Sequence, residues 1–240
     1  MTTRTATPAG SKRSWPVPAA LIALVAIAVI AGVLRLVQLS GGPATLPANP
    51  RYDASPVPVV VHVVSAIVFA LVGAFQFVPR LRRRPRAWHR RAGRVVVVAG
   101  LGVALSALWL NQFFPRAHAT RDIVYPLRWV FGVALVVTLV LGFRAARSRN
   151  FPRHRAWMIR SFAIALVGGT QVFTLWFGGA IFGTGDIAQA LMIVGAWAVN
   201  LAFAEWVIRR PARARRRRVG ASRRVESIPA QAGARAGAPS

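Results

Sequence analysis

The chain has 240 residues, of which 55% are hydrophobic, and it carries a formal net charge of +27. A water-soluble domain has no place for both features, whereas a membrane protein faces lipid with apolar residues and gathers charge in its loops. The absence of cysteine excludes disulfides, thiolate metal sites and cysteine nucleophiles, and the chain holds only 5 carboxylates. Paired-carboxylate hydrolysis and oxygen-ligand cation cages therefore have little material to work with.

Six apolar segments long enough to cross a bilayer follow one another along the chain. A hydrocarbon core about 30 Å thick needs roughly 20 apolar residues per helix, and a backbone in lipid must satisfy its own hydrogen bonds. We place the spans at residues 17–34, 57–78, 93–113, 124–143, 156–177 and 187–208. A secretory signal is the alternative for the first segment, but its apolar run would be only about 7–15 residues long. The sequence predicts an all-α bundle of six transmembrane helices.

The distribution of arginine predicts the orientation. Loops around 80–94 and 144–155 and the region after 208 are crowded with arginine, whereas the intervening loops hold only Arg51, Arg116 and Arg121. Positive charge stays on the cytoplasmic side, so both termini are expected there. We therefore expect a cytoplasmic segment at 1–16, a transmembrane domain at 17–208 and a disordered basic cytoplasmic tail at 209–240.

Polar residues form stripes on two of the predicted helices. At 100° per residue, one face of the second span and one face of the fifth each carry polar and small side chains. We expect an interior polar site between these spans, to which the sixth span adds Asn200. Its predicted members are His62, Ser65, Gln76, Gln171, Thr174 and Asn200. The alternative is that these side chains only hold helices together through hydrogen bonds and close packing.

Charged residues and histidines gather at the inner ends of the spans. Glu205 lies at a depth similar to that of Arg160, and Arg209 is one turn further on, which predicts a salt bridge at the inner interface. A proton-accepting role for Glu205 is the sharper alternative. The predicted cytoplasmic mouth of the site comprises His89, Arg90, Arg94, His154, Arg155, Arg160 and Glu205.

The four histidines divide by predicted depth into an outer pair, His62 and His118, and an inner pair, His89 and His154. Two such pairs are what a membrane electron carrier with two bis-histidine haems would show. A structural or lipid-facing role for each histidine is the competing interpretation. We therefore expect no cofactor, and haem b is the alternative.

At these residues the sequence resembles the uncharacterised bacterial membrane proteins called domain-of-unknown-function family 2306. Members typically show a histidine in an early span and a glutamine near its inner end, here His62 and Gln76. A His-Arg-x-x-Gly-Arg element matches residues 89–94, and a His-Arg-x-Trp-Met-x-Arg-Ser element matches 154–161. Gln171 stands where members often carry an arginine in the fifth span. The resemblance covers about Pro58–Arg209 and implies a polytopic membrane protein of the bacterial inner membrane, without an established reaction.

The basic tail predicts partners. Arginines beside a cytoplasmic helix end attract anionic lipid head groups, at about 1 kcal/mol each near the surface. Aromatic residues are almost all in the spans, so stacking platforms for nucleic-acid bases are missing from the tail and no nucleic acid is expected. Protein partners are not predicted by any pattern.

Two functions of different classes follow. The first is a non-enzymatic membrane protein, either a small transporter or an accessory or scaffold subunit. The second is an electron carrier that uses haem or quinone. A hydrolase is third, because no carboxylate can be placed beside a histidine to complete a Ser-His-Asp set.

Overall fold

The computed structural model describes residues 16–47, 52, 55–77, 86–114 and 118–226. Helices account for most of the described chain, and no strand occurs in it, so the all-α prediction is confirmed. They are α1 (Pro16–Leu39), α3 (Pro56–Gln76), α5 (Arg86–Phe113), α6 (His118–Arg147), α7 (Phe151–Ala165), α8 (Val167–Phe182) and α9 (Asp186–Glu226).

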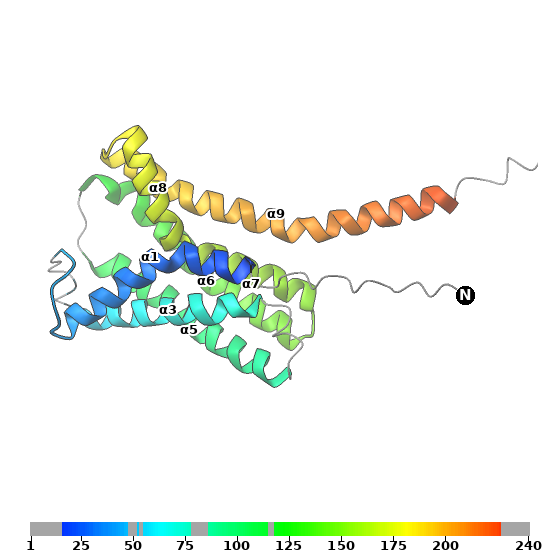
Figure 1. Cartoon of the computed structure of the whole chain (residues 1–240), viewed down its shortest axis with the longest axis horizontal. Helices are drawn as coiled ribbons and strands as arrows, with labels where there is room; N and C mark the ends of the chain where they lie inside the picture. The colour runs from blue at the N-terminus through cyan, green and yellow to red at the C-terminus, as the bar shows by residue number, and fades with distance from the viewer. Residues whose placement is uncertain (1–15, 48–51, 53–54, 78–85, 115–117, 227–240) are drawn as a thin grey trace, which may run out of the picture.

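Five helices are long and apolar enough to cross a membrane by themselves. The fifth predicted span corresponds to α7 and α8, which are long and apolar enough only as a pair and bend by 43° at a break. Figure 1 shows the α6–α7 connection and the α8–α9 turn at opposite ends of the molecule, as expected if this pair crosses the bilayer once. Large apolar side chains such as Val98 (70% exposed) and Trp176 (72% exposed) lie on the surface, where lipid would cover them.

Local sequence explains the ends of several helices. Pro56 and Pro58 begin α3, because proline fixes a helical φ where its missing N–H is not needed. The Asn150 side chain caps α7 by accepting a hydrogen bond from the Arg153 amide at 3.2 Å. Arg144 and Arg147 lie in the last turn of α6, where positive charge complements the helix dipole.

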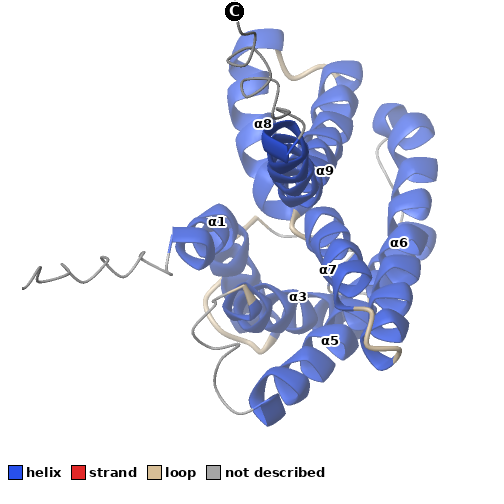
Figure 2. Cartoon of the chain, turned by 90° about the vertical axis from the view of Figure 1, so that its right-hand side faces the viewer, coloured by secondary structure: helices blue, strands red, loops and turns tan. Residues whose placement is uncertain are grey.

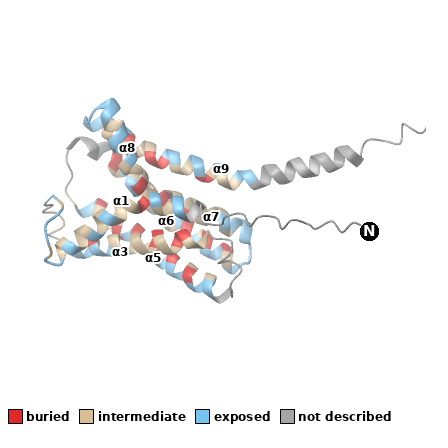
Figure 3. Ribbon diagram, viewed as in Figure 1, coloured by how far each residue is buried: buried red, intermediate tan, exposed pale blue. Residues whose placement is uncertain are grey.

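Most of the interior is one hydrophobic core shared by α1, α3, α5, α6 and α7 (Figures 1 and 2). At its centre the ring of Phe69 on α3 stacks on Phe162 of α7 with centroids 4.5 Å apart. Glycines allow the helices to come this close, since a Cβ at Gly73 would overlap the Phe162 ring. In Figure 3 the buried residues follow the inward faces of these helices.

A second, smaller core lies beside α9. Its buried members are Val124, Ala190, Ile193 and Trp197, and the Trp197 ring stacks on Phe131 of α6 at 4.3 Å. Helices α8 and α9 pack against each other as a hairpin (Figure 2). We refer to α8 and the Asp186–Arg210 part of α9 as the α8–α9 hairpin.

The chain differs from expectation after Arg209. We expected disorder from this point, but α9 continues to Glu226. Arginine and alanine are good helix formers, and extending an existing helix avoids the cost of nucleation. Residues 1–15 and 227–240, which include most of the predicted N-terminal segment and the end of the predicted tail, lie outside the described residues.

Candidate functional site

The structure divides the predicted polar site among several helix pairs. On α3, His62 points toward α5, where its Nδ1 lies 3.0 Å from the Ser106 hydroxyl. Ser65 also lies against α5, because a Cβ at Gly102 would overlap its side chain. Spans two and five do meet, as predicted, but through the rings of Phe69 and Phe162 and not through polar groups. His62 and Ser65 therefore join α3 to α5.

Gln76 lies in the last turn of α3. Its Oε1 is buried and has no hydrogen-bond partner among the described residues. Burying a polar atom without a partner costs free energy, so the Gln76 side chain is an unsatisfied hydrogen-bond acceptor inside the described structure.

Polar groups also gather at the break between α7 and α8. There Asn200 of α9 makes hydrogen bonds to residues on both sides of the break. The Asn200 side-chain amide donates to the Ala163 carbonyl at 3.0 Å, and its Oδ1 accepts from the Thr170 hydroxyl at 2.8 Å. Ala163 precedes the break and Thr170 follows it, so one side chain bridges both halves of the span. Backbone groups freed by a break in a membrane helix must find other partners, and Asn200 supplies one.

Leu166 lies at the centre of this break and is 7% exposed, so the interruption is inside the protein. The next turns of α8 carry Gln171 and Thr174, and the Thr174 hydroxyl donates to the Gln171 carbonyl at 3.3 Å. Of the predicted site, Gln171, Thr174 and Asn200 thus lie along α8 and the facing part of α9.

An ion-pair network joins α7 to α9 at the end of the bundle that the sequence predicts to be cytoplasmic. Arg160 Nε lies 2.6 Å from Glu205 Oε1, and Arg209 Nε lies 3.5 Å from Glu205 Oε2. The predicted salt bridge is therefore present, with the Arg160 and Glu205 side chains 29% and 30% exposed. Arg160 also lies over the Trp157 ring, 4.9 Å from its centroid.

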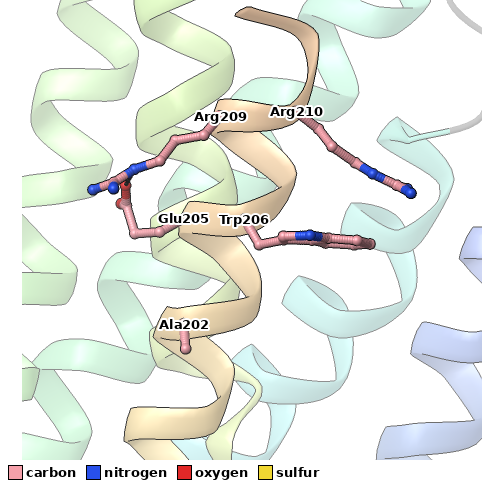
Figure 4. A pocket seen from close by; sticks show the side chains of 5 residues that line it. All are labelled: Ala202, Glu205, Trp206, Arg209 and Arg210. Carbon is pink, nitrogen blue, oxygen red and sulfur yellow. Dashed lines mark ion pairs between the residues drawn. The ribbon is translucent and has the colours of Figure 1, made fainter. Parts of the chain in front are cut away.

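A pocket of about 240 Å³ opens on α9 next to this network. In Figure 4, Arg209 and Glu205 project to one side of the helix and Arg210 and Trp206 to the other. The Arg210 guanidinium lies 4.1 Å from the centroid of the Trp206 ring. Ala202 completes the lining one turn earlier.

The remaining residues of the predicted cytoplasmic mouth lie on α5 and α7. His154 is half-buried, and its Nδ1 lies 2.8 Å from the Gly142 carbonyl oxygen of α6. His89 is half-buried on α5, whereas Arg90, Arg94 and Arg155 are exposed. The side chain of His118 lies outside the described residues, so the outer histidine pair is not described. Among described residues, no group of three or more His, Asp or Glu is placed to hold a metal ion.

Comparison with known proteins gives one match. Residues 59–208, more than half of the chain, match the family model described as "Predicted membrane protein (DUF2306)". The chain belongs to this family. The matched residues agree with the predicted range of about Pro58–Arg209, and the resemblance found in the sequence is confirmed. No curated protein and no solved structure matches the chain.

The elements that resemble DUF2306 have visible structural roles here. In residues 154–161, His154 bonds to α6, Arg160 pairs with α9 and Ser161 is completely buried. Its hydroxyl donates to the Thr138 hydroxyl of α6 at 3.0 Å. This short DUF2306 element therefore connects α7 to both of its neighbours, α6 and α9.

Asn111 and Trp197 are among the buried residues with polar side-chain atoms that the sequence predictions did not include in the site. Asn111 of α5 is 4% exposed and donates to the Tyr125 carbonyl at 3.2 Å, while its Oδ1 has no partner among the described residues. Trp197 is 6% exposed, and its Nε1 likewise lacks a described partner. The mid-span position of Trp197, away from both aromatic belts, was the available sign that it packs inside the protein.

Proposed function

We propose that the protein is a non-enzymatic membrane transporter for a small polar solute, with the solute path beside the break in the fifth span. The observation that carries the proposal is the interruption at buried Leu166, with Asn200, Thr170 and Gln171 gathered around it. Transporters bind their solutes at discontinuous helices, because interrupted backbone and helix ends supply polar groups inside the bilayer.

The division of the core supports a moving part. Buried members of the larger core come from α1, α3, α5, α6, α7 and Leu166, and none that is described belongs to α8 or α9. The second core around Trp197 is smaller, and it joins α9 to Val124 and Phe131 of α6. We take the hairpin and the remaining helices as two bodies that meet at this smaller core, and a break between two bodies is where a hinge absorbs the change in φ and ψ. In this proposal the hairpin rocks against the other helices about Leu166.

The Arg160–Glu205 ion pair would act as the inner contact between these two bodies. Arg160 belongs to α7 and Glu205 to α9, so their separation must change when the hairpin moves. A partly exposed pair contributes only about 0–1 kcal/mol, which is small enough to form and break in each cycle.

The arginine distribution supports an inner-membrane location with both termini in the cytoplasm. Arg144 and Arg147 end α6, and Arg209 and Arg210 come at the end of the last span, after an even number of further crossings. Positive residues at one end of the bundle favour the cytoplasmic side.

Cysteine accessibility tests the proposed path, because the natural chain contains no cysteine. Single cysteines at Thr170, Gln171 and Thr174 are labelled in intact cells with a membrane-impermeant thiol reagent. Phe173→Cys is the matched control, because Phe173 belongs to the same helix and is 39% exposed on the outward surface. The transporter predicts labelling at Thr170 or Thr174 and protection at Phe173.

The competing non-enzymatic role is an accessory or scaffold subunit, in which these polar groups serve packing only. Protection of all three interior positions from both sides of the membrane would refute the path and favour that role. The accessory role is supported by three polar side chains whose hydrogen bonds go to neighbouring helices, namely those of His62, Ser161 and Asn200.

A second candidate function, haem-based electron transfer, is favoured by one specific observation. The carbonyl of Gly142 can only accept, so the Nδ1 of His154 carries a proton, and of the two neutral tautomers the contact selects the one with the lone pair on Nε2. This is the tautomer that an iron-ligating imidazole needs, with its orientation fixed by the second nitrogen. An absorption spectrum of the protein from haem-replete cells tests it: a Soret band lost in His154→Ala supports haem, and a colourless preparation removes it.

A further inference from the structure

The pocket on α9 has an excess of positive charge. Its lining contains Arg209 and Arg210 but only one carboxylate, Glu205. That carboxylate is already shared between Arg160 and Arg209, and Arg210 adds a further positive charge on the other side of the helix (Figure 4). Nothing in the described network neutralises the remainder, and an anionic ligand would.

The guanidinium of Arg210 is oriented by an aromatic ring. It lies 4.1 Å from the centroid of Trp206, so contact with the indole face leaves its N–H groups available at the edge. Planar guanidinium groups bind phosphate oxygens through paired hydrogen bonds. Arg209, whose side chain is 67% exposed, projects from the other side of the helix (Figure 4).

The surface next to the pocket is apolar. Phe203 is 63% exposed and its ring lies 5.5 Å from that of Trp206, and Val199 one turn earlier is 59% exposed. The polar opening where the apolar part of α9 ends, with the apolar strip next to it, matches a molecule with a charged head and hydrocarbon tails. A free phosphate ion would use the first feature but not the second.

The geometry points to a binding site for the phosphate head group of an anionic phospholipid, seated in the pocket that Arg209 and Arg210 line, with its acyl chains along Val199 and Phe203. The volume of about 240 Å³ is below the range of about 300–1,000 Å³ that holds a whole drug-sized ligand. It therefore suits a head group whose tails remain in the bilayer. This site differs from the general attraction of a basic tail to membranes, because it depends on particular side chains.

Native mass spectrometry of the purified full-length protein in detergent tests the site. Phosphatidylglycerol, zwitterionic phosphatidylcholine and inorganic phosphate are titrated separately. The Arg209→Gln/Arg210→Gln variant is expected to lose about 30-fold in affinity for phosphatidylglycerol, the factor corresponding to two arginine–head-group contacts. Arg217→Gln/Arg218→Gln is the matched control, since it removes the same charge from the same helix two turns away, and it is expected to lose less than about 5-fold.

Ala202→Leu tests the shape of the pocket without changing charge. Its larger side chain fills the end of the pocket, so affinity for phosphatidylglycerol should fall while all arginines remain. Equal losses in the two double-arginine variants, or no effect of Ala202→Leu, would overturn the site in favour of a diffuse surface charge. Equal binding of phosphatidylcholine, or equal binding of inorganic phosphate, would overturn the anionic-lipid assignment.

Discussion

Replacing Asn200 by leucine is the sharpest test of the two hydrogen bonds by which Asn200 connects α7 to α8. Leucine has a similar size but can neither donate to the Ala163 carbonyl nor accept from the Thr170 hydroxyl. Side-chain hydrogen bonds between membrane helices contribute about 0.6 kcal/mol each, and leaving a carbonyl unpaired in a buried place costs about 1 kcal/mol more. We therefore expect the free energy of unfolding to fall by about 2 kcal/mol.

The assay is reversible unfolding in mixed micelles with increasing sodium dodecyl sulfate, followed by far-ultraviolet circular dichroism. Thr170→Val is the matched variant, because it removes only the hydroxyl that donates to Asn200. It should cost about 0.6 kcal/mol. In the double variant the effect should be smaller than the sum of the two single effects by about the same amount, since both remove one shared bond.

The reasoning is refuted if Asn200→Leu is as stable as the natural protein. It is also refuted if the two substitutions are fully additive, because Asn200 and Thr170 would then not interact across the break.

Three further predictions follow from close contacts. Gly169→Ala should lower the free energy of unfolding by about 1–3 kcal/mol, because the new Cβ would overlap the Leu24 carbonyl of α1. Gly168→Ala, with open space around it, should be neutral or stabilising. Equal effects of the two substitutions in the same unfolding assay would contradict this. Arg160→Glu should weaken the protein by about 1 kcal/mol, and adding Glu205→Arg should restore most of the loss if the pair joins α7 to α9. His62→Ala and Ser106→Ala should each cost about 0.6 kcal/mol, and the double variant should cost little more than either alone.

The transmembrane character was predictable because the apolar runs are long and the backbone has few choices in lipid. The break at Leu166 was not predictable from the same pattern. Residues 156–177 are mostly apolar and contain no proline, and the pair Gly168–Gly169 is the one marked weakness in their helix propensity. The break depends on tertiary contacts, in which Gly169 meets α1 and Asn200 reaches across from α9.

The polar stripes show which features of the site helix periodicity can predict and which it cannot. Rotation by 100° per residue correctly groups residues on one face, but it does not say which neighbour that face meets. His62 and Ser65 therefore share a face as predicted, yet that face meets α5. The Arg160–Glu205 pair was easier to predict. The chain has few carboxylates, and opposite charges at equal depth in a membrane form ion pairs because an unpaired charge there is costly.

The most direct test concerns whether α7 and α8 cross the membrane as one broken span. Single cysteines at Ser148, before α7, and at Thr184, after α8, are labelled in intact cells and in inverted vesicles with an impermeant thiol reagent. The account predicts labelling of Ser148→Cys only from the cytoplasmic side and of Thr184→Cys only from the opposite side. Labelling of both from the same side would make α7–α8 a re-entrant loop, put the two termini on opposite faces and contradict the six-span arrangement.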